Sequence, residues 1–120
     1  MIAYVANTTV HVSDQERALR FYVDILGFEK RIDTRFAGGD RWLEVAPAGA
    51  AASLVLAPRR GARGGEFAGI VFGTDDIHAA YEDLRRRGVV FTEAPAAQAP
   101  GMPRAQFVDH DGNRFVLVQP

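Results

Sequence analysis

The sequence has no cysteine in its 120 residues. This absence excludes a disulfide framework, a thiolate metal site and a cysteine nucleophile. A strong charge of either sign is also lacking: 14 Lys and Arg side chains face 15 Asp and Glu side chains, for a net charge of −1. The balance gives no electrostatic reason to expect nucleic acid or an acidic membrane surface as a partner.

Long apolar runs are missing as well. No stretch approaches the roughly 18 consecutive apolar residues that a membrane-spanning helix needs. The opening MIAYVANTTVHVSD lacks the basic start and apolar core of a secretory signal peptide. We therefore expect a cytoplasmic protein with no membrane partner.

The residues that are present suit one globular domain, with 48% hydrophobic and 24% charged side chains. In the first half, a helix capped by Ser13 or Asp14 and stopped by Gly27 is expected after an initial strand. In the second half, the corresponding helix is capped by Asp75 or Asp76 and stopped by Gly88. The β-branched and aromatic stretches predict strands over 4–12, 28–36, 41–46, 52–57, 67–73 and 89–93, then a Pro/Ala loop over 93–103 and a closing hairpin.

The two halves repeat the same order. Asp14 and Gly27 are 13 residues apart, as are Asp75 and Gly88, and the halves overlay at an offset of 61. The pattern predicts an α+β fold of two βαβββ modules, about 1–57 and 66–120, joined by a linker over 58–65. A four-stranded sheet with a helix on one face leaves its other face bare. The modules are therefore expected to bury those faces or to line a cavity.

Three stretches carry a family resemblance: VSDQERALRFYVDILGFE (12–29), GIVFGTDDIHAAYEDLRRRGVVF (69–91) and FVDHDGNRFVLVQ (107–119). They resemble the vicinal oxygen chelate superfamily, which includes glyoxalase I, bleomycin resistance proteins and extradiol dioxygenases. The resemblance implies paired modules with concave mixed sheets, a homodimer and ligand sites in the sheets. It implies no single reaction, because the group includes lyases, dioxygenases, epimerases and non-catalytic drug binders.

The resemblance also implies four positions at which metal-dependent members carry His, Glu or Gln ligands. These positions fall on Asn7, Val55, Gly69 and Val116. Valine and glycine side chains have no donor atom, and a neutral amide is a weak ligand. We therefore predict a metal-independent member with no cofactor.

The cluster of polar residues from Asp109 to Asn113 invites comparison with a calcium loop. An EF-hand needs glycine at its sixth position and glutamate at its twelfth, whereas here glycine comes fourth. A tight turn explains the same residues. Of the histidines, His110 is expected in that turn and His78 on a solvated helix face, whereas strand alternation places His11 on the expected cavity side.

The remaining inner-face positions are mostly apolar and predict a pocket for a small hydrophobic or aromatic molecule. The predicted ligand-binding residues are Asn7, Thr9, Phe36, Trp42, Val55, Phe67, Gly69, Met102, Phe107, Arg114 and Val116. A drug-sequestering protein of the bleomycin-resistance type is the concrete form of this prediction, with no catalytic residue assigned.

Two alternatives stay open. One is an enzyme of this superfamily, a lyase, an isomerase or a dioxygenase-like catalyst that uses non-standard residues. Its acid or base would come from His11, Asp33, Glu44 or Arg114. The other is a subunit whose pocket is vestigial and whose dimer surface carries the function.

Overall fold

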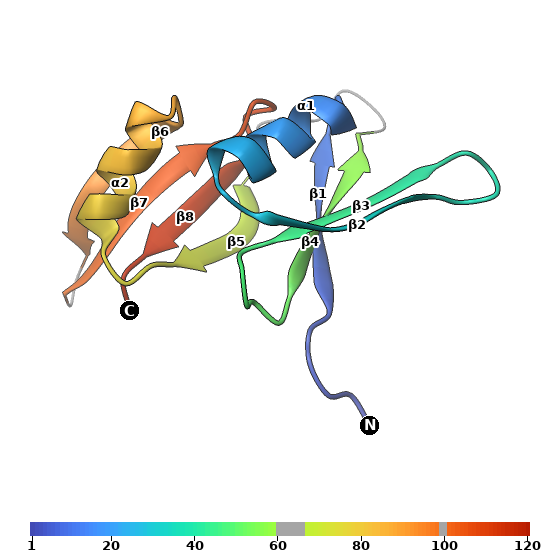
Figure 1. Cartoon of the computed structure of the whole chain (residues 1–120). Coiled ribbons are helices and arrows are strands. Elements are labelled where there is room, and N and C mark those ends of the chain that lie inside the picture. The colour runs from blue at the N-terminus through green and yellow to red at the C-terminus, as the bar shows by residue number, and fades with distance from the viewer. Residues whose placement is uncertain (60–66, 99–100) are drawn as a thin grey trace. The chain divides into compact units, whose positions relative to one another are not determined.

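The computed structural model describes residues 1–59, 67–98 and 101–120 (Figure 1). The elements follow the order β1 (Asn7–Val12), α1 (Gln15–Leu19), η1 (Arg20–Ile25), β2 (Glu29–Arg35), β3 (Arg41–Ala46), β4 (Ser53–Pro58), β5 (Phe67–Gly73), α2 (Ile77–Arg86), β6 (Val90–Gln98), β7 (Met102–Val108) and β8 (Arg114–Val118). The chain divides into two compact units, Met1–Arg63 and Gly64–Pro120. The predicted pair of βαβββ modules is confirmed.

Each unit contains one four-stranded mixed sheet. The strand order is β1-β4-β3-β2 in the first unit and β5-β8-β7-β6 in the second. In each sheet the first strand of the module runs parallel to the last, and the other neighbours are antiparallel. The topology therefore repeats, as the order of the predicted elements indicates.

Alternation along β1 separates a buried face from an exposed one, whereas the first four residues of β4 are buried on both faces. The buried side chains of this unit include Val10, Val12, Phe21, Tyr22, Leu43, Val45, Leu54 and Leu56. The helical segment α1–η1 supplies Phe21 and Tyr22, and the even positions of β1 and β4 supply valines and leucines. The odd positions of β1 and β4 consequently lie on the opposite face.

The core of the second unit is built on aromatic rings. Phe107 is 2% exposed, and its ring lies 5.5 to 6.1 Å, between centroids, from those of Phe72, Phe91 and Phe115. Tyr81 of α2 meets Phe91 edge-on at 4.7 Å. This helix is thereby attached to its sheet by an aromatic contact.

Local capping fixes where the helices begin. The Asp14 carboxylate accepts a hydrogen bond of 3.0 Å from the backbone N–H of Arg17, and this bond lowers the pKa of Asp14. In the second module Asp76, not Asp75, is the cap, and accepts from the N–H of Ala79 at 3.0 Å. Gly27 and Gly88 follow the helices with φ of 81° and 94°.

The first helix contains a π-helical segment, η1, that the sequence prediction missed. Asp14 to Gly27 spans 13 residues, but the true equivalents Asp76 to Gly88 span 12. A π turn accommodates one additional residue within a helix. The offset between the modules is therefore 62 at the caps and 61 at the glycines.

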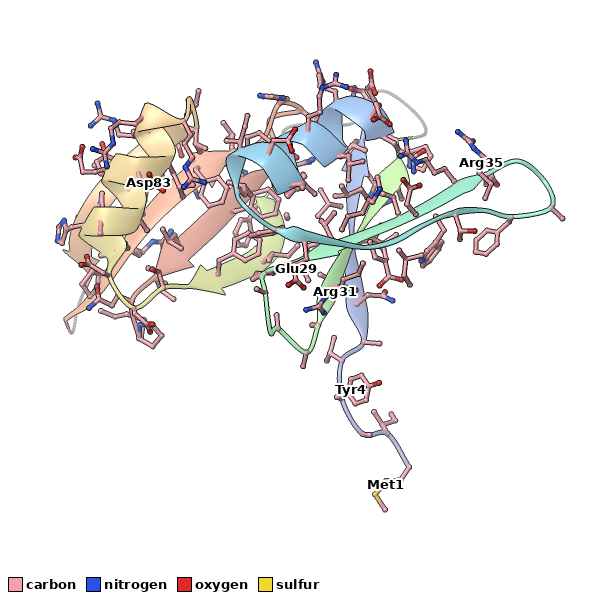
Figure 2. The ribbon with its side chains drawn as sticks, viewed as in Figure 1. Met1, Tyr4, Glu29, Arg31, Arg35 and Asp83 are labelled. Carbon is pink, nitrogen blue, oxygen red and sulfur yellow. The ribbon has the colours of Figure 1, made fainter. Side chains whose placement is uncertain are left out.

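Three predicted strand boundaries are wrong. The first strand begins at Asn7 rather than residue 4, because its partner β4 begins at Ser53, which pairs with Asn7. Figure 2 shows Met1 and Tyr4 on the extended segment before it. The predicted loop over 93–103 is largely strand: β6 continues to Gln98, and Met102 starts β7 rather than lying in a loop.

The strand β6 accommodates Pro95 because it is the outermost strand of its sheet. Proline donates no hydrogen bond, so it is tolerated on an edge strand. The pairing with β7 shifts register between Glu93 and Ala96, on either side of the proline. Of the predicted linker over 58–65, Pro58 ends β4, and residues 60–65 lie outside the described part.

The Asp109–Asn113 segment is a tight turn, as predicted. The Asp109 carboxylate accepts from the backbone N–H groups of Asp111 and Asn113 at 2.9 and 2.8 Å, and from the Asn113 side-chain amide at 2.9 Å. Gly112 adopts φ of 78°. The two aspartates and the asparagine thus serve the hairpin connection.

None of the helices in the described ranges is long and apolar enough to cross a membrane.

A candidate ligand pocket in the first module

The first module contains a pocket of about 360 Å³. Its lining residues are His11, Phe36, Asp40, Arg41, Trp42, Val55, Ala57 and Pro58. His11 of β1 pairs with Ala57 of β4 in the parallel ladder. The floor of the pocket is therefore formed by adjacent strands, on the face opposite the buried Leu54 and Leu56.

Two aromatic rings form one wall. The Phe36 and Trp42 rings lie 5.7 Å apart between centroids with planes inclined at 51°. Phe36 closes the tip of the β2–β3 hairpin, where its N–H donates to the Asp40 carbonyl at 2.9 Å and Gly39 adopts φ of 89°. Phe36 is 56% exposed, so a ligand in the pocket would cover apolar surface that is now in water.

A side-chain hydrogen bond holds the indole of Trp42 in place. Its Nε1–H donates to Glu44 Oε2 at 2.7 Å, and the other oxygen of Glu44 accepts from the Ser53 hydroxyl. Trp42 and Glu44 are two residues apart on β3 and share a face. Glu44 pairs across the ladder with Val55, which itself lines the pocket.

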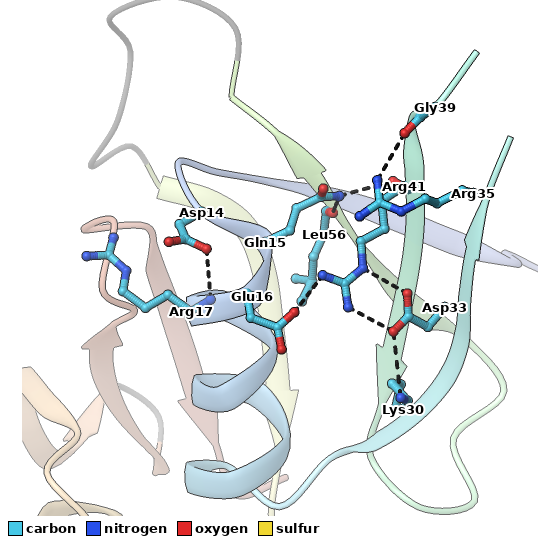
Figure 3. Close-up of polar contacts among 10 residues, drawn as sticks. All are labelled: Asp14, Gln15, Glu16, Arg17, Lys30, Asp33, Arg35, Gly39, Arg41 and Leu56. Carbon is cyan, nitrogen blue, oxygen red and sulfur yellow. Dashed lines mark hydrogen bonds and ion pairs between the residues drawn. The ribbon is translucent and has the colours of Figure 1, made fainter. Parts of the chain in front are cut away.

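A second polar cluster holds the hairpin to the helix (Figure 3). The Arg41 guanidinium donates to both oxygens of Asp33 at 2.8 Å and to Glu16 at 2.7 Å. The bidentate hydrogen bond from Arg41 lowers the pKa of Asp33 to about 2, and the two carboxylates raise the pKa of Arg41.

The helix start is tied to the same strands. The Gln15 side-chain amide donates to the carbonyls of Arg41 and Leu56 at 3.1 and 2.9 Å. The positive charge of Arg41 is balanced by the carboxylates of Asp33 and Glu16. These contacts hold the start of β3 against β2 and the helix.

The structure brings three predicted site residues together in this pocket: Phe36, Trp42 and Val55. Asn7 and Thr9 lie exposed on β1 and are not among the lining residues. His11, expected on the cavity side, does line the pocket. The prediction did not name Asp40, Arg41, Ala57 and Pro58 as ligand-binding, although the alternation through Val55 points to Ala57.

The other six predicted residues belong to the second unit. Phe67 and Arg114 are register partners at one end of the β5–β8 ladder, and Val116 pairs with Val71. Gly69, with φ of 72°, lies where that ladder shifts register. Met102 is exposed at the start of β7, whereas Phe107 is enclosed by the aromatic core.

The candidate acids and bases of the enzymatic alternative have different surroundings. His11 lines the pocket, and Asp33 is bound by Arg41. Glu44 accepts from Trp42 and Ser53, while Arg114 begins β8 in the second unit. Across the described ranges, no group of three His, Asp or Glu side chains is placed to hold a metal ion.

Comparison with known proteins gives the chain a family. Residues 2–117 match the model of the Glyoxalase/Bleomycin resistance protein/Dioxygenase superfamily. Among curated relatives, the uncharacterized protein YetH of Bacillus subtilis (strain 168) is 38% identical, over 99% of this chain and 100% of its own length.

Two solved structures show the same likeness. A superfamily member from Sphaerobacter thermophilus DSM 20745 has 42% identity and a TM-score of 0.92, covering 99% of this chain and 98% of its own. TnmS3, an antibiotic binding protein from Streptomyces sp. CB03234, has 40% identity and a TM-score of 0.87, covering 99% and 97%. The resemblance predicted from three motifs is confirmed, and the chain belongs to the Glyoxalase/Bleomycin resistance protein/Dioxygenase superfamily.

Proposed function

We propose that the protein binds a small, flat aromatic molecule in the first-module pocket, without a metal ion, and sequesters it unchanged. The observation that carries this proposal is the aromatic wall of Phe36 and Trp42 above a floor of Val55 and Ala57. Aromatic rings contribute large apolar contact areas and prefer inclined or offset neighbours. A flat ring system lying against this wall would gain both contributions.

The size and composition of the pocket support the proposal. Its volume of about 360 Å³ falls in the range of roughly 300–1,000 Å³ that small-molecule sites occupy. Apolar walls with a few polar groups, here His11, Asp40 and Arg41, are typical of such sites. The likeness to TnmS3, itself an antibiotic binding protein, favours an antibiotic as the ligand class.

Metal independence is supported by the residues at the four family ligand positions. Asn7 offers only an amide, and Val55, Gly69 and Val116 offer no donor. Binding should therefore be the same before and after treatment with a chelator. A dissociation constant that rises with EDTA and recovers with a divalent ion would contradict this part of the proposal.

The binding test uses two alcohols of different shape, 9-anthracenemethanol and 1-adamantanemethanol, titrated by calorimetry. We expect saturable binding of the planar compound and weaker binding of the bulky aliphatic one. Phe36→Ala should weaken binding of the planar compound by roughly tenfold, because one face of the aromatic wall is lost.

Phe67→Ala is the matched control, because Phe67 is similarly exposed but belongs to the second unit. Equal losses in the two variants would contradict the assignment of the site to the first module. Mass spectrometry of the recovered compound separates sequestration from catalysis: a chemically altered compound would favour the enzymatic alternative.

We further propose that the protein is a homodimer, as the family resemblance implies. Light scattering coupled to size-exclusion chromatography should give twice the chain mass of 13.1 kDa. A monomer mass at all concentrations would contradict it.

A further inference from the structure

The hydrogen bonds around Trp42 form a short chain across two strands. The indole donates to Glu44, and Glu44 also accepts from Ser53. Ser53 is 5% exposed, and both hydrogen bonds are partly buried. A carboxylate acceptor makes each bond stronger than a bond between neutral groups.

The strand geometry makes Glu44 an anchor rather than a lining residue. Trp42 and Glu44 lie on one face of β3, and Ser53 lies on the neighbouring β4, two residues before Val55. Trp42 and Val55 line the pocket, whereas Glu44 and Ser53 are not among its lining residues. Any effect of Glu44 on a bound ligand would therefore pass through the indole.

The orientation of the indole determines which shapes fit. An indole held by its N–H has one preferred plane, whereas an unanchored indole can rotate about its side-chain torsions. A fixed plane beside Phe36 presents a flat surface to a planar ligand. A rounded aliphatic ligand gains little from that surface and loses little when the indole turns.

We propose that Glu44 is a positioning residue that fixes the indole of Trp42 and thereby makes the pocket selective for planar aromatic ligands over bulky aliphatic ones. This inference rests on the proposed binding function. Its structural part, the holding of Trp42 by Glu44, is measurable without any ligand.

The sequence offers a direct reporter, because Trp42 is the single tryptophan of the chain. Glu44→Ala removes the acceptor and should lower the fluorescence anisotropy of Trp42 in the free protein. Glu44→Gln keeps a carbonyl oxygen for the indole and an amide for Ser53, so it should restore the wild-type anisotropy. Glu29→Ala is the matched control, since Glu29 lies on β2 of the same sheet and contacts Arg31 rather than the pocket.

Affinities for 9-anthracenemethanol and 1-adamantanemethanol complete the experiment. In Glu44→Ala we expect affinity for the planar alcohol to fall by roughly tenfold, a loss that corresponds to about 1.4 kcal/mol, and affinity for the adamantyl alcohol to change little. Glu44→Gln and Glu29→Ala should keep the wild-type ratio of the two affinities. Circular dichroism checks that each variant is folded.

The outcomes separate this inference from the proposed function. If the wild type binds neither alcohol while Glu44→Ala still mobilises Trp42, the binding function fails and the selectivity part falls with it. If the wild type binds the planar alcohol but a folded Glu44→Ala keeps both its anisotropy and its affinity ratio, the inference is overturned and the binding function stands. If Glu44→Ala does not fold, Glu44→Gln and Ser53→Ala replace it. If Glu44 positions Trp42, Glu44→Gln keeps the wild-type ratio of the two affinities and Ser53→Ala lowers the anisotropy of Trp42. A changed ratio in Glu44→Gln together with an unchanged anisotropy in Ser53→Ala would overturn the inference.

Discussion

At the scale of single residues, the Arg41 side chain links several elements of the first module. It is 14% exposed and donates to two carboxylates that come from different elements, Asp33 on β2 and Glu16 on α1 (Figure 3). A bidentate guanidinium–carboxylate contact fixes both distance and angle. Arg41 therefore couples the hairpin that carries Phe36 and Trp42 to the helix.

The lowered pKa of Asp33 predicts a pH dependence of stability. A carboxylate with a folded pKa of about 2 and an unfolded pKa of about 3.9 binds fewer protons when the protein is folded. Its contribution is complete above about pH 4 and is lost as the pH falls towards 2. Because the ion pair is partly exposed, we expect no more than about 1 kcal/mol.

Urea unfolding measures the contribution of Asp33 to the free energy of unfolding. We compare the wild type with Asp33→Asn from about pH 2 to about pH 6, the rough limits of the titration. The variant should be less stable near neutral pH and should lose less stability on acidification. Parallel pH profiles for the two proteins would contradict the prediction. Glu29→Gln, a more exposed carboxylate on the same strand, is the control.

A glycine after the second helix gives another prediction at this scale. Gly88 adopts φ of 94°, and Gly38, in the β2–β3 hairpin, does not adopt a positive φ. Gly88→Ala should destabilise the protein by about 1–2 kcal/mol because an L residue is strained there. Gly38→Ala should be nearly neutral, since nothing lies within 4 Å of an added Cβ. Thermal unfolding that ranks the two variants in the opposite order would contradict this account.

At the scale of elements, a capping residue in the sequence predicts that a helix begins nearby but does not say which of two adjacent aspartates caps it. The sequence offers two adjacent aspartates before the second helix, and the structure uses Asp76. Asp76→Ala should reduce the free energy of unfolding by about 1 kcal/mol because the N–H of Ala79 loses its acceptor. Asp75→Ala should change it by less than about 0.5 kcal/mol. Chemical denaturation measures both, and equal losses would show that the cap is shared.

Elements defined by neighbouring residues could be predicted from the sequence, and elements defined by distant partners could not. The strands β3 and β5 match the predicted 41–46 and 67–73, since apolar and β-branched residues end at clear breakers. The strand β6 was predicted too short because Pro95 indicates a loop locally, whereas pairing with β7 extends the strand beyond it. The π turn of η1 leaves no distinct mark in the apolar spacing.

Some residues of the candidate site could likewise be predicted from the sequence, and others could not. Alternation along the strands predicted Val55, whereas Phe36 and Trp42 were predicted as wall residues because they are aromatic. Asp40 directly precedes β3 and Pro58 ends β4. They line the pocket because of the backbone path at these strand ends, which the periodicity of the sequence does not describe. The anchoring of Trp42 by Glu44 depends on a side-chain contact that only the folded sheet reveals.

At the scale of the whole molecule, the chain consists of two modules with one topology and different open faces. In the first, Trp42, Val55 and Ala57 line a pocket. In the second, Phe67 and Val71 are about half exposed on β5. The two modules thus share a backbone topology but carry different side chains on these strands.

Ligand binding should stabilise the whole folded chain. A ligand at one hundred times its dissociation constant contributes about 2.7 kcal/mol if it binds the folded state alone. For a chain of this length, that should raise the melting temperature by on the order of 10 °C. Differential scanning fluorimetry with 9-anthracenemethanol measures the shift, which should be markedly smaller in Phe36→Ala at the same ligand concentration. A shift that is equal in the two proteins would contradict binding at the pocket.

The register shifts in β2 and β6 have a consequence for behaviour at high concentration. Each of these strands is the outermost of its sheet and carries an irregularity, between Lys30 and Ile32 in one and around Pro95 in the other. The side chains of β2 are exposed and mostly charged, with Glu29, Arg31 and Arg35 spaced along it (Figure 2). A bent, charged or proline-bearing edge is a poor template for strand addition by another chain. Strand addition at these two edges, β2 and β6, is therefore disfavoured, while the hairpin beside the pocket stays accessible to solvent.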